Sequence, residues 1–431
     1  MLKDILKKII LDSQEKSQNY IPRTIIPKKT LLTQNCFVLV GPRRAGKSYY
    51  LFEIKEELQK ELKKDKTDFV YINFEDERLI DLKTNDLDLI LEAYSELFNN
   101  KEPILLLDEI QNIKHWEKFA RRLADNNYKV FITGSNSKLL SKEIASTLGA
   151  RYLQINITPF NFNEFLKANN FNYDLKTIYH SKDIYKLKEH LKNYLEYGGF
   201  PEISKKEDNY SKLELLKTYF DLYIYKDLSK RWKIENPEHL VMIIKKIKED
   251  LGNETNPNSI YSKLFSIKIP ISVKTTYNYV SFLKNVFLIS ELPLYRKSFA
   301  KRESQKKYYF LDTGFLKLFE IDNEIGKKLE NLVYTEIIKN KQEVFYWRNK
   351  NGNECDFVIK NKNTFDLIQV TYEYNTNSKN RELKGLTEAM DYFKCNNGTI
   401  ITYDQEKTIT VDSRKIKIVP LYKWLLEGES P

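Results

Sequence analysis

Short apolar runs alternate with segments of helical spacing through about the first 160 residues. The runs begin at FVLV (residues 37–40) and continue with DFVYINF, ILLLDE, KVFITGSN and YLQINI. Apolar runs without polar alternation are typical of strands that are buried on both faces. Strand–helix alternation of this kind predicts an α/β fold in which helices cover both faces of a parallel sheet.

The pattern changes after Pro159. Helical segments rich in Tyr, Leu and Lys extend to about residue 250, and GNETNPNS (252–259) reads as a loop. Two or three short helices are then expected, followed by a β-like segment near 308–311, a helix (GKKLENLVYTEIIKN) and the strands EVFYW, CDFVIK and DLIQVTY. We therefore divide the chain into five segments: 1–30, 31–158, 159–251, 252–315 and 316–431.

The turn after the first apolar run carries a nucleotide-binding motif. Its residues fit G-x-x-x-x-G-K-[ST] at every position. Glycines let the backbone turn tightly towards phosphate oxygens, and the N–H groups that open the following helix face the anion. We expect Lys47 to reach the β- and γ-phosphates of ATP and the Ser48 hydroxyl to bind Mg²⁺. The predicted nucleotide-binding residues are Gly41, Pro42, Arg43, Arg44, Ala45, Gly46, Lys47, Ser48 and Tyr49.

Two adjacent acids end the third apolar run, ILLLDE, about 60 residues after the glycine-bearing turn. An Asp at the carboxyl end of a buried strand can hold Mg²⁺, and a neighbouring Glu can polarise the attacking water. We predict these roles for Asp108 and Glu109. The sequence thus indicates ATP hydrolysis with Mg²⁺ as the cofactor.

Four residues are open candidates for contact with the nucleotide. ITGSN places Ser135 and Asn136 at the tip of a strand, where either side chain can orient water or sense the γ-phosphate, unless the segment only forms a turn at Gly134. Arg151 is either an arginine finger or a surface charge. Arg44 either touches phosphate or is solvated.

Composition restricts the class of protein. No stretch approaches the roughly 20 apolar residues of a membrane span, and the N-terminal residues lack the long apolar core of a secretion signal. They predict instead a short amphipathic helix. We therefore expect a cytoplasmic protein without membrane contact. Three cysteines and four histidines show no metal-ligand spacing, so neither zinc nor Cys–His catalysis is expected.

Positive charge is concentrated in one window. The formal net charge is +11, and residues 258–310 hold ten Lys/Arg against two acids, a net +8. Such a concentration indicates a polyanionic partner. The window also looks like a winged helix-turn-helix, so double-stranded DNA is the predicted partner, unless the module is a packing unit with a solvated basic face. The candidate DNA-binding residues are Lys274, Thr275, Tyr277, Arg296, Lys297, Lys301 and Arg302.

The order of longer motifs resembles a known family. GPRRAGKS, YINFEDERL, ILLLDEIQNIKHWE, ITGSNSKLL, LGARY, TPFNFNEFL, YLEYGGFPE and YFDLYIYKDL occur in the same order in a family of prokaryotic AAA+-type P-loop ATPases with a fused C-terminal region. KKYYFLDTGF, GKKLENLVYTEI, GNECDFVI and IQVTY extend the resemblance to nearly the whole chain, apart from its first 20 residues.

This resemblance implies an AAA+/ASCE-type sheet, in which one more strand lies between the phosphate-loop strand and the Asp108 strand. It also implies that 31–158 is the ATPase core and that 159–251, with Tyr197–Pro201, is a helical lid. Residues 1–30, of which the first 20 lie outside the resemblance, are expected to form an N-terminal helix or arm. Asn136 matches the sensor-1 position, and Arg151 matches an arginine proposed to act on nucleotide.

The C-terminal segment resembles the PD-(D/E)xK restriction-endonuclease-like fold. In active members two carboxylates hold Mg²⁺, and a Lys two positions after the second one activates water. The matching residues are Glu330, Asp356, Gln369 and Thr371. Gln is a poor Mg²⁺ ligand and Thr lacks the charge, so the segment reads more readily as an inactive module than as a nuclease.

Three functions stay open from the sequence. The first is an ATPase coupled to DNA through the basic window. The second is an ATP-dependent nuclease that uses Glu330 and Asp356. The third is a signalling or scaffold ATPase whose partner is a protein or a second copy of the chain.

Overall fold

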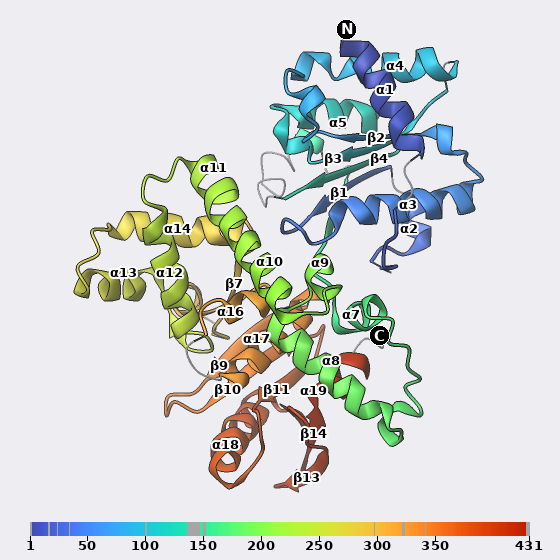
Figure 1. Cartoon of the computed structure of the whole chain (residues 1–431). Coiled ribbons are helices and arrows are strands. Elements are labelled where there is room, and N and C mark those ends of the chain that lie inside the picture. The colour runs from blue at the N-terminus through green and yellow to red at the C-terminus, as the bar shows by residue number, and fades with distance from the viewer. Residues whose placement is uncertain are drawn as a thin grey trace. The chain divides into compact units, whose positions relative to one another are not determined.

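The computed structural model describes most of the chain, in ten stretches. They are residues 2–15, 18–23, 25–33, 35–99, 101–135, 147–149, 152–296, 298–320, 324–340 and 342–427. The chain divides into two compact units, Met1–Thr158 and Pro159–Pro431, and each is described by itself (Figure 1).

The first unit is built on a five-stranded parallel sheet with the order β2-β3-β4-β1-β5. β4 lies between β1 and β3, so the implied extra strand between the phosphate-loop strand and the Asp108 strand is confirmed. All five strands form where apolar runs predict them. Their bounds are β1 (Cys36–Val40), β2 (Phe69–Asn73), β3 (Ile104–Asp108), β4 (Val130–Gly134) and β5 (Leu153–Asn156).

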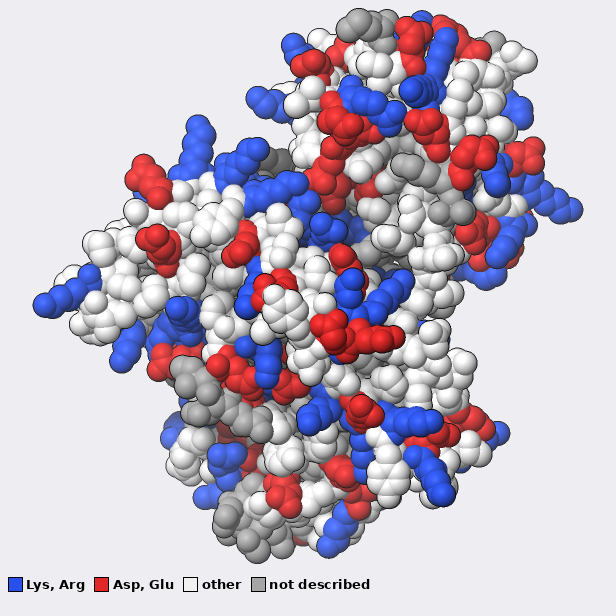
Figure 2. Space-filling view, in the orientation of Figure 1, with Lys and Arg blue, Asp and Glu red and all other residues white. Residues whose placement is uncertain are grey.

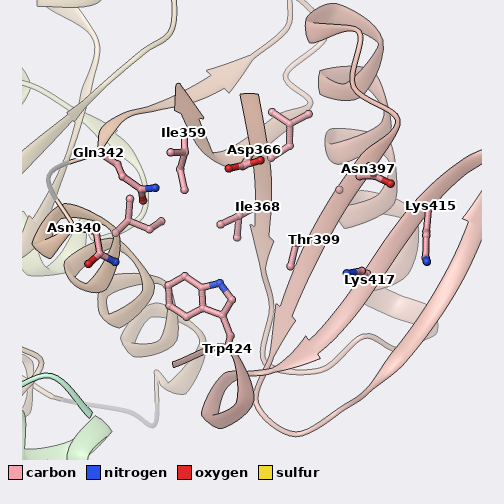
Figure 3. A pocket seen from close by; sticks show the side chains of 13 residues that line it. Asn340, Gln342, Ile359, Asp366, Ile368, Asn397, Thr399, Lys415, Lys417 and Trp424 are labelled. Atoms are coloured by element: carbon pink, nitrogen blue, oxygen red, sulfur yellow. The ribbon is translucent and has the colours of Figure 1, made fainter. Parts of the chain in front are cut away.

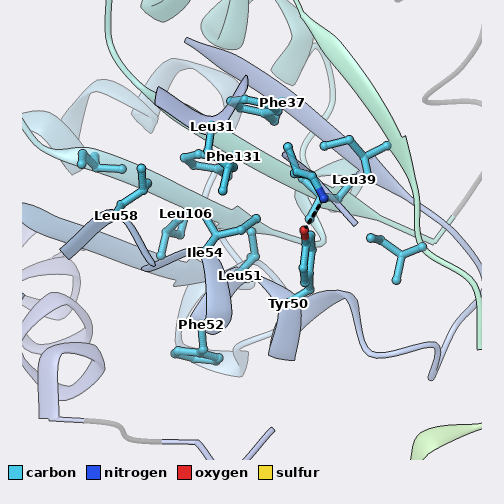
Figure 4. Packing of buried hydrophobic residues seen from close by; sticks show 14 of the residues in the cluster. Leu31, Phe37, Leu39, Tyr50, Leu51, Phe52, Ile54, Leu58, Leu106 and Phe131 are labelled. Atoms are coloured by element: carbon cyan, nitrogen blue, oxygen red, sulfur yellow. Dashed lines mark hydrogen bonds between the residues drawn. The ribbon is translucent and has the colours of Figure 1, made fainter. Parts of the chain in front are cut away.

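Helices cover this sheet on both faces, as the alternating pattern predicts (Figure 1). The apolar stripe of α3, with Leu51, Ile54 and Leu58, packs on side chains that the strands alternately point towards it, such as Phe37 and Leu106 (Figure 4). The helices are α1 (Leu2–Glu15), α2 (Lys28–Thr33), α3 (Lys47–Leu62), α4 (Asp88–Phe98) and α5 (Trp116–Asp125). The predicted N-terminal amphipathic helix is α1, which contacts α4 and β2.

The second unit begins with the predicted helical segment. It includes the π-helix η7 (Leu222–Ser229), a rare form that often marks functional positions. The α-helices here are α7 (Phe162–Ala168), α8 (Asp183–Tyr197), α9 (Pro201–Ser204), α10 (Asn209–Asp221), α11 (Lys230–Trp232) and α12 (Pro237–Glu249).

A small sheet with three helices follows. The antiparallel strands have the order β6-β8-β7, and α12, α13 and α14 contact one another beside them. The new elements are β6 (Glu254–Thr255), α13 (Pro257–Ser266), α14 (Val273–Asn285), β7 (Ile289–Pro293), α15 (Phe299–Ser304) and β8 (Lys306–Phe310). The expected wing differs in one respect: α15 interrupts the connection between β7 and β8.

The chain ends in a six-stranded mixed sheet with the order β13-β14-β12-β11-β10-β9. α18 packs on one face, against Val358, Leu367 and Ile400, and α17 precedes the first strand. The elements are α16 (Gly314–Lys317), α17 (Ile325–Lys339), β9 (Glu343–Arg348), β10 (Glu354–Lys360), β11 (Phe365–Val370), α18 (Thr376–Phe393), β12 (Asn397–Thr402), β13 (Lys407–Val411), β14 (Arg414–Pro420) and α19 (Leu421–Glu427).

Candidate functional site

The predicted phosphate loop joins β1 to the start of α3. At Gly41, a Cβ atom would lie 1.9 Å from the backbone oxygen of Ile157. Only glycine therefore allows these two backbone segments to approach so closely. Gly46 has φ 93°, a left-handed conformation that glycine adopts without strain. These two positions turn the loop tightly and leave the N-terminal N–H groups of α3 facing it.

Lys47 is buried, and its ammonium group is held inside the loop. Its Nζ donates to the carbonyl oxygens of Gly41 and Pro42 at 3.2 and 3.0 Å. The same Nζ lies 3.6 Å from Oε1 of Glu109. The lysine therefore links the loop to the acid pair at the end of β3.

Asp108 is the centre of a hydroxyl network. Tyr71 of β2 donates to its Oδ2 at 2.8 Å, and the hydroxyl of Thr133 on β4 donates to its Oδ1. The Ser48 side chain is hydrogen-bonded to the same carboxyl group, so the two predicted Mg²⁺ ligands are neighbours. Burial raises the pKa of Asp108, with a smaller contribution from the charge of Glu109.

Glu109 has the opposite electrostatic balance. Burial raises its pKa, but the Lys47 ammonium, hydrogen bonding from Gln111 and the charge of Arg43 outweigh burial, so the net pKa is lowered. Its backbone has φ 53°, and its N–H donates to the Thr133 hydroxyl at 2.9 Å. The carboxylate is therefore ionised and aimed at the phosphate loop, as a general base requires.

Two residues in this region escaped the sequence interpretation. Thr133 bonds both to Asp108 and to the N–H of Glu109, although the ITGSN motif drew attention only to later positions. Arg23 of the N-terminal arm donates to the backbone oxygens of Ala45 at 3.1 Å and Thr158 at 2.9 Å. No local motif marks Arg23, because its partners lie far away in the sequence.

Other predicted residues take different positions. Arg43 forms an ion pair with Glu75 at 3.2 Å, and the side chains of Arg44 and Tyr49 are exposed. Tyr50, the next residue, is buried, and its hydroxyl accepts from the N–H of Ile26 (Figure 4). Asn136 and Arg151 lie outside the described residues.

The residues present fit Mg²⁺–ATP. A hydroxyl oxygen and a carboxylate supply the oxygen ligands that Mg²⁺ prefers, and a lysine and a helix N-terminus face the place of the phosphates. Ser48, Asp108, Lys47 and Glu109 are brought together in one network. When bound, the ion would neutralise charge that develops on the phosphate oxygens.

Comparison with known proteins divides the chain into three matched regions. A model described as an AAA domain matches residues 33–166, and two models described as domains of unknown function, DUF8612 and DUF4143, match residues 188–324 and 325–424. The uncharacterized protein MJ1544 of Methanocaldococcus jannaschii is 38% identical over 98% of this chain and 96% of its own length. The chain belongs to the MJ1544 family. An uncharacterized protein of Haemophilus influenzae is 28% identical over 95% of this chain and 98% of its own.

Among solved structures, the Walker-type ATPase paby2304 of Pyrococcus abyssi is similar, with a TM-score of 0.43, 16% identity and coverage of 68% of this chain and 93% of its own. Cdc6p of Pyrobaculum aerophilum gives a TM-score of 0.29, 14% identity and coverage of 77% and 98%. The AAA domain match and the strand order together identify residues 33–166 of this MJ1544-family chain as an AAA-type P-loop domain.

The candidate nuclease-like residues of the MJ1544-family chain lie around β10. Asp356 is buried, and its Oδ2 accepts from the N–H of Val370 at 2.8 Å. The side-chain oxygen of Gln369 accepts from the N–H of Asp356. Its side-chain nitrogen donates at 2.6 Å to Glu382, a buried acid of α18. Thr371 follows the end of β11, and its hydroxyl donates to the backbone of Glu373. Burial raises the pKa of Asp356, and the negative charge of Glu330 on α17 raises it further.

A cavity of about 570 Å³ opens on the sheet face opposite α18 (Figure 3). Ile359 and Ile368 form its floor, Trp424 of α19 stands at one wall, and Lys415 and Lys417 line its rim. None of the predicted site residues lines it. Within the described stretches, no helix is long and apolar enough to cross a membrane.

Proposed function

We propose that this chain hydrolyses ATP with Mg²⁺ and couples the reaction to binding of double-stranded DNA through residues 252–315. Lys47 binds the terminal phosphates, Ser48 and Asp108 hold the ion, and Glu109 polarises the attacking water. The network around Asp108 and Glu109 supports these roles. Asn136 and Arg151 remain proposed contacts to the γ-phosphate.

The observation that carries the DNA proposal is the charge of the α13–α14 surface. Residues 257–290 contain four lysines and neither Asp nor Glu. Lys263, Lys268 and Lys274 are exposed, whereas Lys284 pairs with Glu291 at 2.6 Å. A segment that lacks acids and exposes several lysines suits a phosphate backbone.

The order of elements supports a winged helix-turn-helix. α12, β6, α13, α14, β7 and β8 follow one another as helix, strand, two helices and a strand pair. In such modules the second helix of the pair enters the major groove with its N-terminal residues. Lys274 and Tyr277 are exposed near the start of α14. The N–H of Thr275 instead donates to the hydroxyl of Ser272, the N-cap residue of α14, at 3.0 Å.

The predicted wing residues contribute less to this surface than the sequence suggests. Arg296 donates to the backbone oxygen of Arg348, and Arg302 is half-buried. Lys297 lies outside the described residues, as does the side chain of Lys301.

A second basic stretch lies beside α14. Trp232 of α11 stacks on Phe282 of α14 with ring centroids 4.4 Å apart, and Lys230 and Lys233 next to it are exposed. Figure 2 shows Lys and Arg side chains gathered over α11. We therefore extend the proposed DNA surface from α14 to α11.

Electrophoretic mobility shifts with a short duplex across a salt series test this proposal. If three lysines contact three phosphates, a fourfold rise in salt weakens binding about 40-fold, because the slope is about −0.9 per contact. The double variant Lys268→Ala/Lys274→Ala should weaken binding and flatten the slope by about 1.8. The matched control is Lys407→Ala, an exposed lysine on β13. No binding at low salt would refute the coupling to DNA.

A protein partner is the second candidate, and one observation favours it. Phe265 in the last turn of α13 and Ile267 just after that helix are 64% and 51% exposed. Exposed apolar side chains of this size are typical of contact with apolar surface. Phe265→Ser/Ile267→Ser should leave DNA binding unchanged if DNA is the partner.

A further inference from the structure

A buried lysine lies among the carboxylates of the nuclease-like segment. Lys307 comes from β8, outside the C-terminal segment that resembles the nuclease-like fold, and its side chain is 1% exposed. Its Nζ lies 2.5 Å from Oε1 of Glu354 on β10 and 3.4 Å from Oε1 of Glu330 on α17. The ring of Tyr346 lies 5.3 Å from the same ammonium group.

The carboxylates around Lys307 are also held by other groups. Tyr309 donates to Oε1 of Glu330 at 2.6 Å. Arg348 binds Oε2 of Glu354 at 2.6 Å and forms a second ion pair with Glu254 at 3.2 Å. The acids therefore already have organic cations and hydroxyl donors as partners.

The backbone at Gly252 packs against the Glu330 carboxylate. Gly252 has φ 79°, and a Cβ atom there would lie 2.8 Å from Oε2 of Glu330. The loop after α12 therefore passes directly over this carboxylate. A side chain at position 252 would require the Glu330 carboxylate to shift, and it would be strained at this positive φ.

A divalent metal ion does not fit this arrangement. The metal would need the carboxylate oxygens that Lys307 and Arg348 occupy, and a buried ammonium group beside it would repel it. The position of the second acid in active nucleases holds Gln369, whose amide is bonded within the protein. Among the described residues, no group of three or more His, Cys, Asp or Glu side chains is arranged to hold a metal ion.

We propose that the Lys307 ammonium is the permanent cation of the Glu330–Glu354–Asp356 centre, in the place that the nuclease resemblance assigns to a divalent metal ion. The centre joins the three-stranded sheet, through β8, to α17 and β10. Its ion pairs stabilise the contact between these elements, and the centre does not cleave phosphodiesters. Removal of the ammonium leaves clustered carboxylates in a space that a metal ion can enter.

Metal-dependent thermal unfolding tests this assignment. All proteins carry Asp108→Asn, so that the phosphate loop does not contribute, and each is unfolded in EDTA and in millimolar Mn²⁺. Lys307→Ala should be less stable in EDTA, and Mn²⁺ should raise its midpoint by about 5 °C or more, because an ion that binds only the folded state stabilises it. Addition of Glu330→Gln should abolish this rise.

Two controls are needed, one for the volume of the Lys307 side chain and one for the loss of any lysine on β8. Lys307→Met removes the charge but fills the volume, so Mn²⁺ should not raise its midpoint. Lys306→Ala removes the neighbouring lysine, which pairs with Glu291 at 3.0 Å and lies outside the centre, so it should not respond either. The protein with Lys307 intact should show no Mn²⁺-dependent rise, and it should not nick plasmid DNA.

Two results would overturn the proposal. One is a Mn²⁺-dependent rise in the protein with Lys307 intact that Glu330→Gln removes. The other is a folded Lys307→Ala protein whose midpoint Mn²⁺ does not move. If Lys307→Ala does not fold, Mn²⁺ binding to the protein with Lys307 intact is measured by paramagnetic resonance. Bound Mn²⁺ that is lost on Glu330→Gln substitution would contradict the assignment. The absence of bound Mn²⁺ would support it.

Discussion

Glu109→Gln separates the two roles that we propose for Glu109, polarising the attacking water and pairing with Lys47. The amide has the size of the carboxyl group and tolerates the same backbone conformation, so the phosphate loop should keep its shape. It lacks the negative charge that polarises water and attracts Lys47. We therefore expect slow turnover together with undiminished ATP binding.

The structure sets the size of both effects. A unit charge pair at 3.6 Å interacts by about 4–5 kcal/mol at an effective dielectric constant of about 20, before desolvation is subtracted. Lys47 must give up part of this attraction to reach a triphosphate. If about 1.4 kcal/mol of it is released in the variant, ATP affinity rises about tenfold. Loss of a general base should lower kcat by about 10²–10⁴-fold.

Calorimetric titration with ATP and a phosphate-release assay measure the two quantities. The matched control is Glu92→Gln, an exposed acid on α4 in the same unit. It should change neither. A variant with normal phosphate release would refute the role of Glu109 as base. A variant that binds ATP more weakly than wild type would refute competition between Glu109 and the phosphates for Lys47.

The remaining predictions concern the loop and the second unit. Lys47→Ala should sharply weaken ATP binding, which calorimetry measures, and unchanged affinity would contradict its assignment to the phosphates. Gly41→Ala should cost about 1–3 kcal/mol or more of unfolding free energy in denaturant titration, because its Cβ meets the backbone of Ile157; a stable variant would disprove the tight approach. Burial raises the pKa of Asp312 to about 6, against hydrogen bonds from Gly199 and Gly314. Because the folded state then binds the proton more tightly than the unfolded state, the stability that Asp312 contributes should fall as pH rises from about 4 to 6. The thermal unfolding midpoint of the wild type should therefore fall between about pH 4 and pH 6 relative to that of Asp312→Asn. Midpoints of the two proteins that change in parallel with pH would contradict the raised pKa.

The first unit and its candidate nucleotide site were predictable because the residues that form them lie close together in the sequence. The phosphate loop is one turn between a strand and a helix, and Asp108 and Glu109 follow a single apolar run. Each strand of the first sheet is buried on both faces, so it appears as an uninterrupted apolar run. Parallel strands place their carboxyl ends at one edge, which brings the loop and the acids together.

Residues whose partners are distant in sequence were not predictable in this way. Arg23 acts on the backbone at Ala45 and Thr158, and no motif surrounds it. The elements after residue 372 lacked a clear pattern in the sequence. β13 is largely exposed and α18 begins with a long polar stretch, so neither presents a continuous apolar signal.

The net charge of a sequence window overstates the charge that the folded protein exposes. The window 258–310 has a net charge of +8, but Lys307 is neutralised by Glu330 and Glu354, which lie outside it. Lys306 and Lys284 share Glu291. The charge available to a polyanion is therefore smaller than the sum over the window, and it is concentrated on α13 and α14. If DNA binds this chain, its affinity must depend on the exposed lysines of those helices and remain unchanged when the buried ones are replaced without loss of folding.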